Sequence, residues 1–187
     1  MSRKTSTLYA LPVRDVVSGG QELPVTGQTV SYAQGDDGYI EAGMQWPTPR
    51  FTDNGDGTVT DSLTGLMWLK DGGCFRNTWS SAFSTIANFN SNTAGYNCLG
   101  YSANYTDWRL PNVNELESLT NYGASNQPSW LNSQGFLNAK SSYYWSSTTY
   151  RGSTTQAWIV NMQNAGSAYI RKSYTYYAWP VREGRIQ

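Results

Sequence analysis

The sequence predicts an α+β fold with two helices and short twisted antiparallel sheets. Three observations lead to this fold class: short runs of strand-forming residues separated by turns, two stretches with helical spacing and suitable caps, and a composition rich in aromatic residues and glycine. Of the 187 residues, 39% are hydrophobic and 14% are charged, which excludes a disordered polyelectrolyte and suits one ordinary domain. We therefore expect one folded domain over residues 29–187.

Residues 1–28 are expected to form an N-terminal arm or linker, because prolines and glycines interrupt this stretch and it has no sustained periodicity. Its early positive charge is not followed by an apolar run long enough for a signal peptide. No later stretch is long and apolar enough to cross a bilayer. The sequence thus predicts no visible signal peptide and no membrane insertion.

Short strands joined by turns are predicted along much of the chain. They cover residues 29–33, 51–53, 58–61, 65–70, 143–150, 157–162, 167–173 and 177–182. Asp53-Asn54-Gly55-Asp56-Gly57, between two of these strands, predicts a hairpin turn in which glycine adopts a positive φ. A calcium loop fits less well, since the third and fifth positions, which would have to supply oxygen ligands, are glycines.

Two helices are predicted from spacing and caps. The first follows a cap at Asn77 or Thr78 and presents one apolar stripe to a core. The stripe consists of Trp79, Ala82, Phe83 and Ile86. The second begins at Asn112, with Glu115 reaching back to the cap and Gly123 offering a stop. Its apolar positions are Val113, Leu116 and Leu119.

Cys74 and Cys98 lie on either side of the first predicted helix. If they are oxidised, they close a loop of about 25 residues and stabilise the domain by roughly 3 kcal/mol. Both lie in stretches rich in glycine and asparagine, where packing rarely needs sulfur. A disulfide is therefore favoured over two free thiols, and the sequence leaves both open.

The C-terminal half is basic although the formal net charge of the chain is zero. No acidic residue occurs between Glu117 and Glu183. Five cations lie between Glu117 and Glu183: Lys140, Arg151, Arg171, Lys172 and Arg182. Such a half could attract anionic partners such as sulfated glycans or nucleic acid, but solvated cations on an uncharged face explain it equally well. Charge alone identifies no partner, and nucleic acid is not expected.

Residues 141–179 have the composition of a contact surface. They contain seven Tyr, seven Ser, five Thr and three Trp, with no Asp or Glu. Tyrosine and tryptophan offer rigid contact area at low entropic cost, and hydroxyls and amides offer adaptable hydrogen bonds, as in antibody combining loops. This composition predicts molecular recognition.

A β-hairpin with two unlike faces is predicted over residues 157–173, with Gly166 in a left-handed position of the turn. The core face is expected to carry Trp158, Val160, Met162, Ala168 and Ile170. The outward face is expected to carry Ile159, Asn161, Ser167, Tyr169, Arg171 and Ser173. Exposed Ile159 and Tyr169 beside polar neighbours would suit a binding face, although scattered exposed apolar residues are common.

Catalysis is not expected. The chain has no histidine, which removes the usual general base and the commonest metal ligand. A hydroxyl nucleophile needs an adjacent base, and Glu183 is the only carboxylate among the last sixty or so residues. The sequence predicts no enzyme, no cofactor and no metal site.

Several ordered motifs resemble the Lcl C-terminal domain family over residues 23–184. They are Arg50-Phe-Thr-Asp-Asn-Gly-Asp-Gly-Thr-Val-Thr-Asp61, Leu63-Thr-Gly-Leu-Met-Trp68, Asp107-Trp-Arg-Leu-Pro111 with Glu115-Leu116, Tyr144-Trp-Ser-Ser-Thr148 and Trp179-Pro-Val-Arg182. The resemblance implies a C-type-lectin-like ligand-binding domain over residues 29–187. The family includes adhesin tips that bind sulfated glycans and variable proteins diversified by retroelements.

The chain is most similar to the retroelement subset, because a Trp-Ser-Ser-Thr start and a Trp-Pro-Val-Arg end bound its C-terminal region. This likeness implies a variable binding surface over residues 150–177, in which adenine-randomised codons never yield the types of Trp158, Met162 and Lys172. The ligand-binding residues it implies are Tyr150, Arg151, Ser153, Thr155, Ile159, Asn161, Asn164, Ser167, Tyr169, Arg171, Ser173, Tyr174, Thr175 and Tyr176.

Two alternatives stand beside this interpretation. An invariant adhesin for anionic glycans would share the fold and the Ser/Tyr-rich face. Asp107-Trp-Arg-Leu-Pro111 with Glu115 also resembles the formylglycine-generating enzyme branch of the fold, but that chemistry depends on C-terminal cysteines, which this chain lacks after Cys98. The family resemblance further implies a protein or glycan on a target cell surface as the partner, and a phage virion or bacterial cell surface as the location. It also implies a possible trimer joined through the N-terminal arm.

Overall fold

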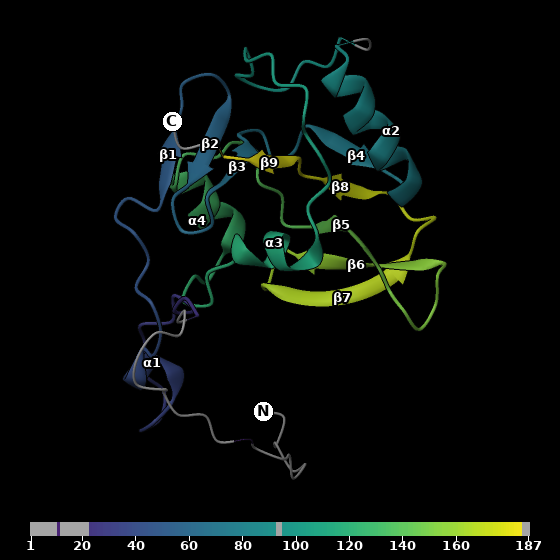
Figure 1. Ribbon diagram of the computed structural model, residues 1–187. Helices are drawn as coiled ribbons and strands as arrows, with labels where there is room; N and C mark the ends of the chain where they lie inside the picture. The colour runs from purple at the N-terminus through teal and green to yellow at the C-terminus, as the bar shows by residue number, and fades with distance from the viewer. Residues whose placement is uncertain (1–10, 12–22, 93–94, 185–187) are drawn as a thin grey trace.

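The computed structural model describes residue 11, residues 23–92 and residues 95–184. These form an α+β fold, which confirms the predicted class (Figure 1). The helices are α1 (Asp37–Ile40), α2 (Trp79–Asn90), α3 (Val113–Ser118) and α4 (Gln127–Ser133). The strands are β1 (Phe51–Asp53), β2 (Thr58–Asp61), β3 (Leu66–Leu69), β4 (Phe75–Asn77), β5 (Tyr143–Thr149), β6 (Gln156–Asn161), β7 (Gly166–Arg171), β8 (Tyr176–Ala178) and β9 (Val181–Glu183).

The strands form two sheets, with the orders β1-β2-β3-β9 and β4-β8-β5-β6-β7. In Figure 1 the second sheet runs from β4 in the upper part of the molecule to β7 at the lower edge. All pairings are antiparallel except that of β5 with β8. Strand β7 therefore ends the sheet and has a neighbour on one side only.

The strand predicted over residues 177–182 is two strands in different sheets. Trp179 and Pro180 separate β8 from β9, and proline lacks the N–H that a continuous ladder would need. The buried ring of Trp179 contacts Trp68 of one sheet and Tyr144 of the other. Its indole Nε1 donates to the Leu69 carbonyl at 2.7 Å. This tryptophan joins the two sheets, and no local sequence pattern predicts that.

The hairpin predicted at residues 53–57 is confirmed and joins β1 to β2. Gly55 and Gly57 both have positive φ, as expected. Gly57 is also confined, because a Cβ there would lie 2.3 Å from the Cα of Tyr101. The close approach places the chain around residue 101 against this turn.

Both predicted helices are present. Thr78 caps α2, and α3 has the predicted capping box between Asn112 and Glu115. Helix α3 ends at a cap on Leu119 instead of continuing to Gly123. On α2 the buried residues are Ala82, Ile86 and Phe89, whereas Phe83 is 39% exposed and packs edge-on against Trp79.

The described residues contain four helices, two more than predicted, and the strand predicted at residues 29–33 is wrong. Asp36 accepts backbone hydrogen bonds from Tyr32, Ala33 and Tyr39, so its side chain forms a turn and caps α1. Helix α4 was predicted as loop, although Asn126 caps it and a proline follows in its first turn. The short strand β4 was also missed.

Part of the predicted arm belongs to the folded domain. Residues 23–25 pair with Met44, and the indole of Trp46 donates to the Val25 carbonyl at 2.9 Å. The amide of Tyr122 donates to the Thr26 carbonyl. The rest of the predicted arm, apart from residue 11, lies outside the described residues.

Cys74 and Cys98 form a disulfide bond, which resolves the choice that the sequence left open. The bond closes a loop with a sequence separation of 24 and joins the entry of α2 to the segment after it. Because cross-linking restricts the unfolded chain, we expect reduction to lower the free energy of unfolding by about 3 kcal/mol. Urea denaturation with and without a reductant measures this loss, and Cys74→Ser should reproduce it without reductant. Equal midpoints in all samples would contradict the expectation.

Candidate functional site

The predicted ligand-binding residues come together at the β7 edge of the second sheet and in the two loops beside it. The exposed ones are Arg151, Thr155, Asn164, Ser167, Tyr169, Arg171, Ser173, Tyr174 and Thr175. The half-buried ones are Tyr150, Ser153, Asn161 and Tyr176. Ile159 is an exception, because only 1% of it is exposed.

The hairpin register differs by one residue from the predicted one. Asn161 pairs with Gly166 as the last pair, and Ala165, not Gly166, has the positive φ. Trp158 consequently pairs with Tyr169, and Ile159 pairs with Ala168. The slip places Tyr169 on the face of Trp158 and Ala168 on the face of Ile159, unlike the prediction. The predicted exposure of Ile159 is wrong, because both faces of β6 are covered where Ile159 and Val160 are buried side by side. The predicted core positions of Trp158 and Ala168 are also wrong, since Trp158 is half-buried and Ala168 is exposed.

A tyrosine stack, consisting of Tyr150, Trp158 and Tyr169, covers one face of the hairpin. The rings of Tyr150 and Tyr169 are parallel, with centroids 3.8 Å apart. Trp158 meets both edge-on, at 5.9 Å and 5.6 Å. Tyr169 remains 46% exposed, and the pKa of Tyr150 is raised by its contact with the Tyr169 hydroxyl. The stack is a neutral aromatic platform, open to solvent.

Gly152 allows Tyr150 to take its place in the stack. A Cβ on residue 152 would lie 2.6 Å from the Tyr150 ring. The loop is closed by the Tyr150 amide, which donates to Gln156, and by the Gln156 amide, which donates to Ser153. Local backbone hydrogen bonds therefore hold the half-buried Tyr150 in a defined position.

A second aromatic group, consisting of Tyr143, Tyr174 and Tyr176, lies on the opposite face of the sheet. Tyr143 pairs with Asn161, which faces away from Trp158 on β6. The Tyr176 ring lies 5.1 Å from Tyr143 and 6.3 Å from Tyr174. Burial raises the pKa of Tyr176, and the two neighbouring tyrosines add to this effect. The predicted site is thus split between two faces that meet at β7.

Fewer positive side chains of this region are free to contact a partner than the sequence suggested, and one carboxylate lies beside them. Lys172 donates to the Thr149 hydroxyl at 2.8 Å and lies 3.7 Å from the centre of the Trp79 ring. Arg151 and Arg171 are exposed and form no ion pair with another described residue. Helix α3 places Glu117 against β7, where its carboxylate accepts a hydrogen bond from Ser167. The acid-free stretch of sequence therefore has an acid beside it in the fold.

Sequence reasoning left two residues out of the candidate site. Trp158 was assigned to the core because it shares a face with Val160 and Met162, and Tyr143 lies outside the region between the two boundary motifs. The correct register would have placed the exposed Tyr169 beside Trp158. The contact of Tyr143 with Tyr176 depends on the parallel pairing of β5 with β8, which has no local signal.

Among the described residues, no group of histidine, cysteine and acidic side chains is arranged to hold a metal ion. No helix in the same part of the chain has the length and apolar character of a membrane span.

The family model of the Lcl C-terminal domain matches residues 57–182, which is more than half of the chain. The chain belongs to the Lcl C-terminal domain family. A comparison with curated proteins finds no match. Membership in this family supports ligand binding or receptor recognition as the general function.

The ordered motifs of this Lcl C-terminal domain are structural. Arg182 forms an ion pair with Asp107 at 2.6 Å, and its guanidinium lies 3.9 Å from the centre of the Tyr105 ring. Arg109 makes a bidentate contact with Glu115, which lowers the pKa of that carboxyl in spite of its partial burial. These contacts tie the last strand to the loop before α3. The motifs therefore stabilise the domain that carries the candidate site, and the candidate region 150–177 lies between the last two of them in the sequence.

Proposed function

We propose that this Lcl C-terminal domain is a receptor-recognition protein with a C-type-lectin-like fold, which binds a protein or glycan on a target cell through the region 150–177. One observation carries the proposal. Uncharged and basic side chains are exposed on the β7 edge and its loops, while the strands that support them are anchored by buried Trp145, Val160 and Met162. Exposed tyrosines on a rigid support have the properties of a binding surface.

The positions of the fixed residue types support diversification by a retroelement. Met162 is fully buried, Lys172 is held by Thr149 and Trp79, and Trp158 supports the tyrosine stack. Most of the residues that adenine randomisation could produce are exposed. Ile159 is buried, so variation there would be limited to apolar side chains. A scaffold of this kind tolerates changes outside the core.

An invariant adhesin for anionic glycans is the second candidate. It is favoured by Arg151 and Arg171, which are exposed and lack an acidic partner among the described residues. Two cations at the edge of an aromatic platform could contact a sulfate group and a sugar ring together. Either candidate requires no cofactor and no catalytic step.

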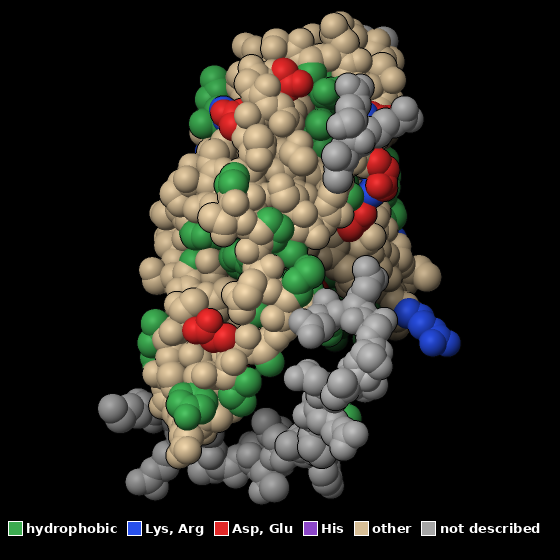
Figure 2. Space-filling model, turned by 60° about the vertical axis from the view of Figure 1, so that its left-hand side comes forward, with side chains coloured by type: hydrophobic (Ala, Val, Ile, Leu, Met, Phe, Trp, Pro, Cys, Tyr) green, Lys and Arg blue, Asp and Glu red, His purple; other side chains and the backbone are tan. Residues whose placement is uncertain are grey.

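We place the protein on a phage virion or a bacterial surface, as a possible trimer. The N-terminal segment supports the trimer, because it exposes several large hydrophobic side chains. They are Val30, Tyr32, Tyr39 and Ile40. Figure 2 shows hydrophobic side chains among polar ones at the lower end of the molecule, at the height of α1 in Figure 1. Adjacent exposed hydrophobic residues are typical of protein contacts. A monomer in sedimentation at high concentration would contradict this.

Binding of the labelled full chain to a panel of bacterial cells and to a glycan array tests the main proposal. A variant with Tyr169→Ala, Ser173→Ala and Tyr174→Ala should lose the signal while keeping its circular dichroism and thermal midpoint. A control with Ser84→Ala, Asn114→Ala and Tyr122→Ala removes exposed side chains elsewhere and should bind normally. Undiminished binding by the first variant would overturn the proposal.

Two further measurements distinguish the candidates. Pyrimidines at the third codon position of the exposed residues, and a near-copy of the 3′ end beside a reverse-transcriptase gene, would support diversification. Binding that weakens with salt and with Arg171→Ala would support the anionic-glycan adhesin. Absence of any copy would exclude the first candidate, and salt-independent binding would exclude the second.

A further inference from the structure

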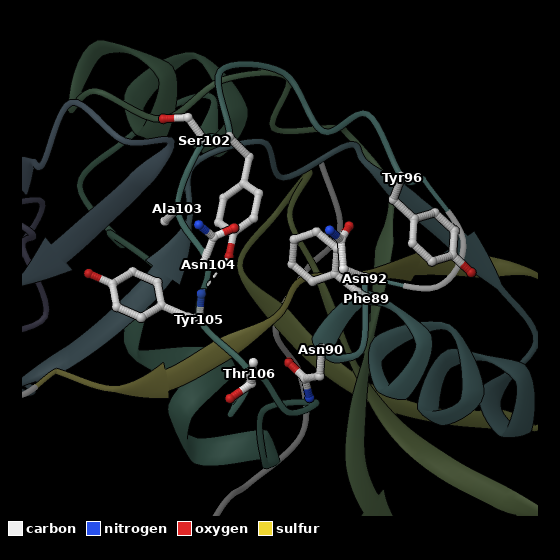
Figure 3. A pocket seen from close by; sticks show the side chains of 10 residues that line it. Phe89, Asn90, Asn92, Tyr96, Ser102, Ala103, Asn104, Tyr105 and Thr106 are labelled. Carbon is white, nitrogen blue, oxygen red and sulfur yellow. Dashed lines mark hydrogen bonds between the residues drawn. The ribbon is translucent and has the colours of Figure 1, made fainter.

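A pocket of about 230 Å³ lies between the end of α2 and the chain over residues 96–106 (Figure 3). It is at the top of the molecule in Figure 1, and β7 lies well below it, as the lower edge strand of the five-stranded sheet. The pocket is therefore distant from the β7 edge, where most of the candidate receptor-binding residues lie. Neither the family motifs nor the recognition proposal uses this pocket.

The wall combines aromatic rings with uncharged polar groups. Figure 3 shows Tyr96 and Tyr105 on opposite sides, with the amides of Asn92 and Asn104 between them. Thr106 adds a hydroxyl at the lower end of this view. The described residues that line the pocket carry no charge. The pocket therefore suits a neutral ligand that has both apolar and hydroxyl-rich surfaces.

The polar groups fall into two classes. Asn90 is occupied, since its amide donates to the Trp108 carbonyl at 2.8 Å and accepts from the Trp108 amide at 2.9 Å. The Tyr101 hydroxyl accepts bonds from the Trp108 indole and the Tyr105 amide. In contrast, the side chains of Asn92 and Asn104 have no hydrogen bond to another described residue. These amides are available to a ligand.

The pocket is held in shape by contacts behind its wall. The disulfide fixes Cys98, and the amide of the next residue, Leu99, donates to Asp71 at 2.9 Å. The Ser102 amide donates to the Asp56 carbonyl, which attaches the wall to the β1–β2 turn. A preformed pocket loses little conformational entropy when a ligand binds.

We propose that this pocket binds a neutral pyranose, such as the terminal sugar of a glycan. A pyranose has an apolar C–H face that suits the electron-rich face of an aromatic ring, and its hydroxyls both donate and accept hydrogen bonds. Carboxamides match such hydroxyls because each can donate and accept. The lack of charge in the wall disfavours sulfated, phosphorylated and acidic sugars. For one sugar unit we expect a Kd of about 1 mM.

The test is a ¹⁵N–¹H NMR titration of the full chain with glucose, galactose, mannose and N-acetylglucosamine. At least one sugar should give saturable shifts in the backbone amides of residues 89–106, with those of β7 unchanged. Glucuronate and glucose 6-phosphate should bind more weakly, and glycerol, which has hydroxyls but no ring, should give no saturable shift. Absence of saturable shifts with all four neutral sugars, or tighter binding of the charged sugars, would overturn the proposal.

Two variants remove the available amides with little effect on the backbone. Asn92 has a φ of 52°, so Asn92→Gly keeps the left-handed conformation, and Asn104→Ala truncates an exposed side chain. Each should weaken binding by roughly tenfold. Asn114→Ala on α3 is the matched control and should bind as the native chain does. If either variant loses its native NMR spectrum, Thr106→Val replaces it in the test, because this change removes the hydroxyl and keeps the side-chain shape. Unchanged affinity in the folded variants would contradict the assignment of the site.

The same titration separates this inference from the proposed receptor recognition. The variant with Tyr169→Ala, Ser173→Ala and Tyr174→Ala should keep its sugar affinity. Loss of sugar binding in that variant would place the sugar on the C-terminal face and overturn the separate pocket.

Discussion

Asp61→Ala is expected to lower the free energy of unfolding by about 3–5 kcal/mol, because it leaves the Arg50 guanidinium buried without its counter-charge. Both side chains are almost inaccessible to solvent. The carboxylate of Asp61 accepts two hydrogen bonds from Arg50, at 3.1 Å and 3.0 Å. It also accepts from the Leu63 amide and the Thr64 hydroxyl. Removing it therefore breaks one buried network at several points.

The surroundings of Arg50 explain why the loss cannot be offset locally. Its guanidinium lies 4.5 Å from the ring centres of both Trp46 and Phe51 and also donates to the Ser118 carbonyl. Without the carboxylate, the guanidinium keeps the Ser118 carbonyl as its one hydrogen-bond acceptor among the described residues. The pair links the N-terminal segment, the first sheet and the end of α3.

Urea denaturation of the native chain and the variant measures this effect. The control is Asp53→Ala, which removes the more exposed ion pair with Lys70 and should cost less than about 1 kcal/mol. Similar losses in the two variants would show that burial of the Arg50–Asp61 pair is not what makes it important.

Tyr169→Ala is expected to weaken attachment to the target cell by roughly 30-fold, because exposed aromatic residues at the centre of an interface often contribute about 2 kcal/mol. Tyr150→Ala should have a similar effect, since the two rings form one platform. The double variant should lose less than the sum, with a coupling energy of about 1 kcal/mol. Gly152→Ala should imitate Tyr150→Ala by displacing that ring.

The measurement is the Kd of each labelled variant on the bacterial strain that binds the native chain. Tyr122→Ala is the control, because it removes another exposed tyrosine, one that lies outside region 150–177. Fully additive losses would show that the stack is not one recognition unit. Unchanged binding in all variants would move recognition to the opposite face, around Tyr174.

Much of the local structure was predictable because its causes are local. The turn at residues 53–57 requires glycine at positive φ, and the capping box of Asn112 and Glu115 needs only four consecutive residues. The stripe on α2 was predicted except for Phe83, which lies at its margin. Helix α4 was missed although its cap at Asn126 and its early proline are local signals. The division of β8 from β9 by Trp179, in contrast, is decided by tertiary contacts.

The candidate site was likewise predictable only where its causes are local. Its sequence region was recognisable from composition, since tyrosines and hydroxyls without acids are unusual over such a length. The faces of the two hairpin strands were combined wrongly, because the positive φ at Ala165 sets a register that differs by one residue. The burial of Ile159 depends on the covering of both faces of β6, which only the packed domain provides. The nearby Glu117 and the second group around Tyr176 depend on helix packing and strand pairing.

By itself, the sequence determined the α+β class, the caps, the first hairpin and the exposed tyrosine- and hydroxyl-rich region that forms the candidate site, because each follows from residues close together in the chain. Only the tertiary structure decided the disulfide, the union of the two sheets through Trp179, the Tyr150–Tyr169 stack and the pocket between Tyr96 and Tyr105. These features join segments that are distant in sequence or depend on an exact strand register, and such contacts are selected by the packing of the whole domain.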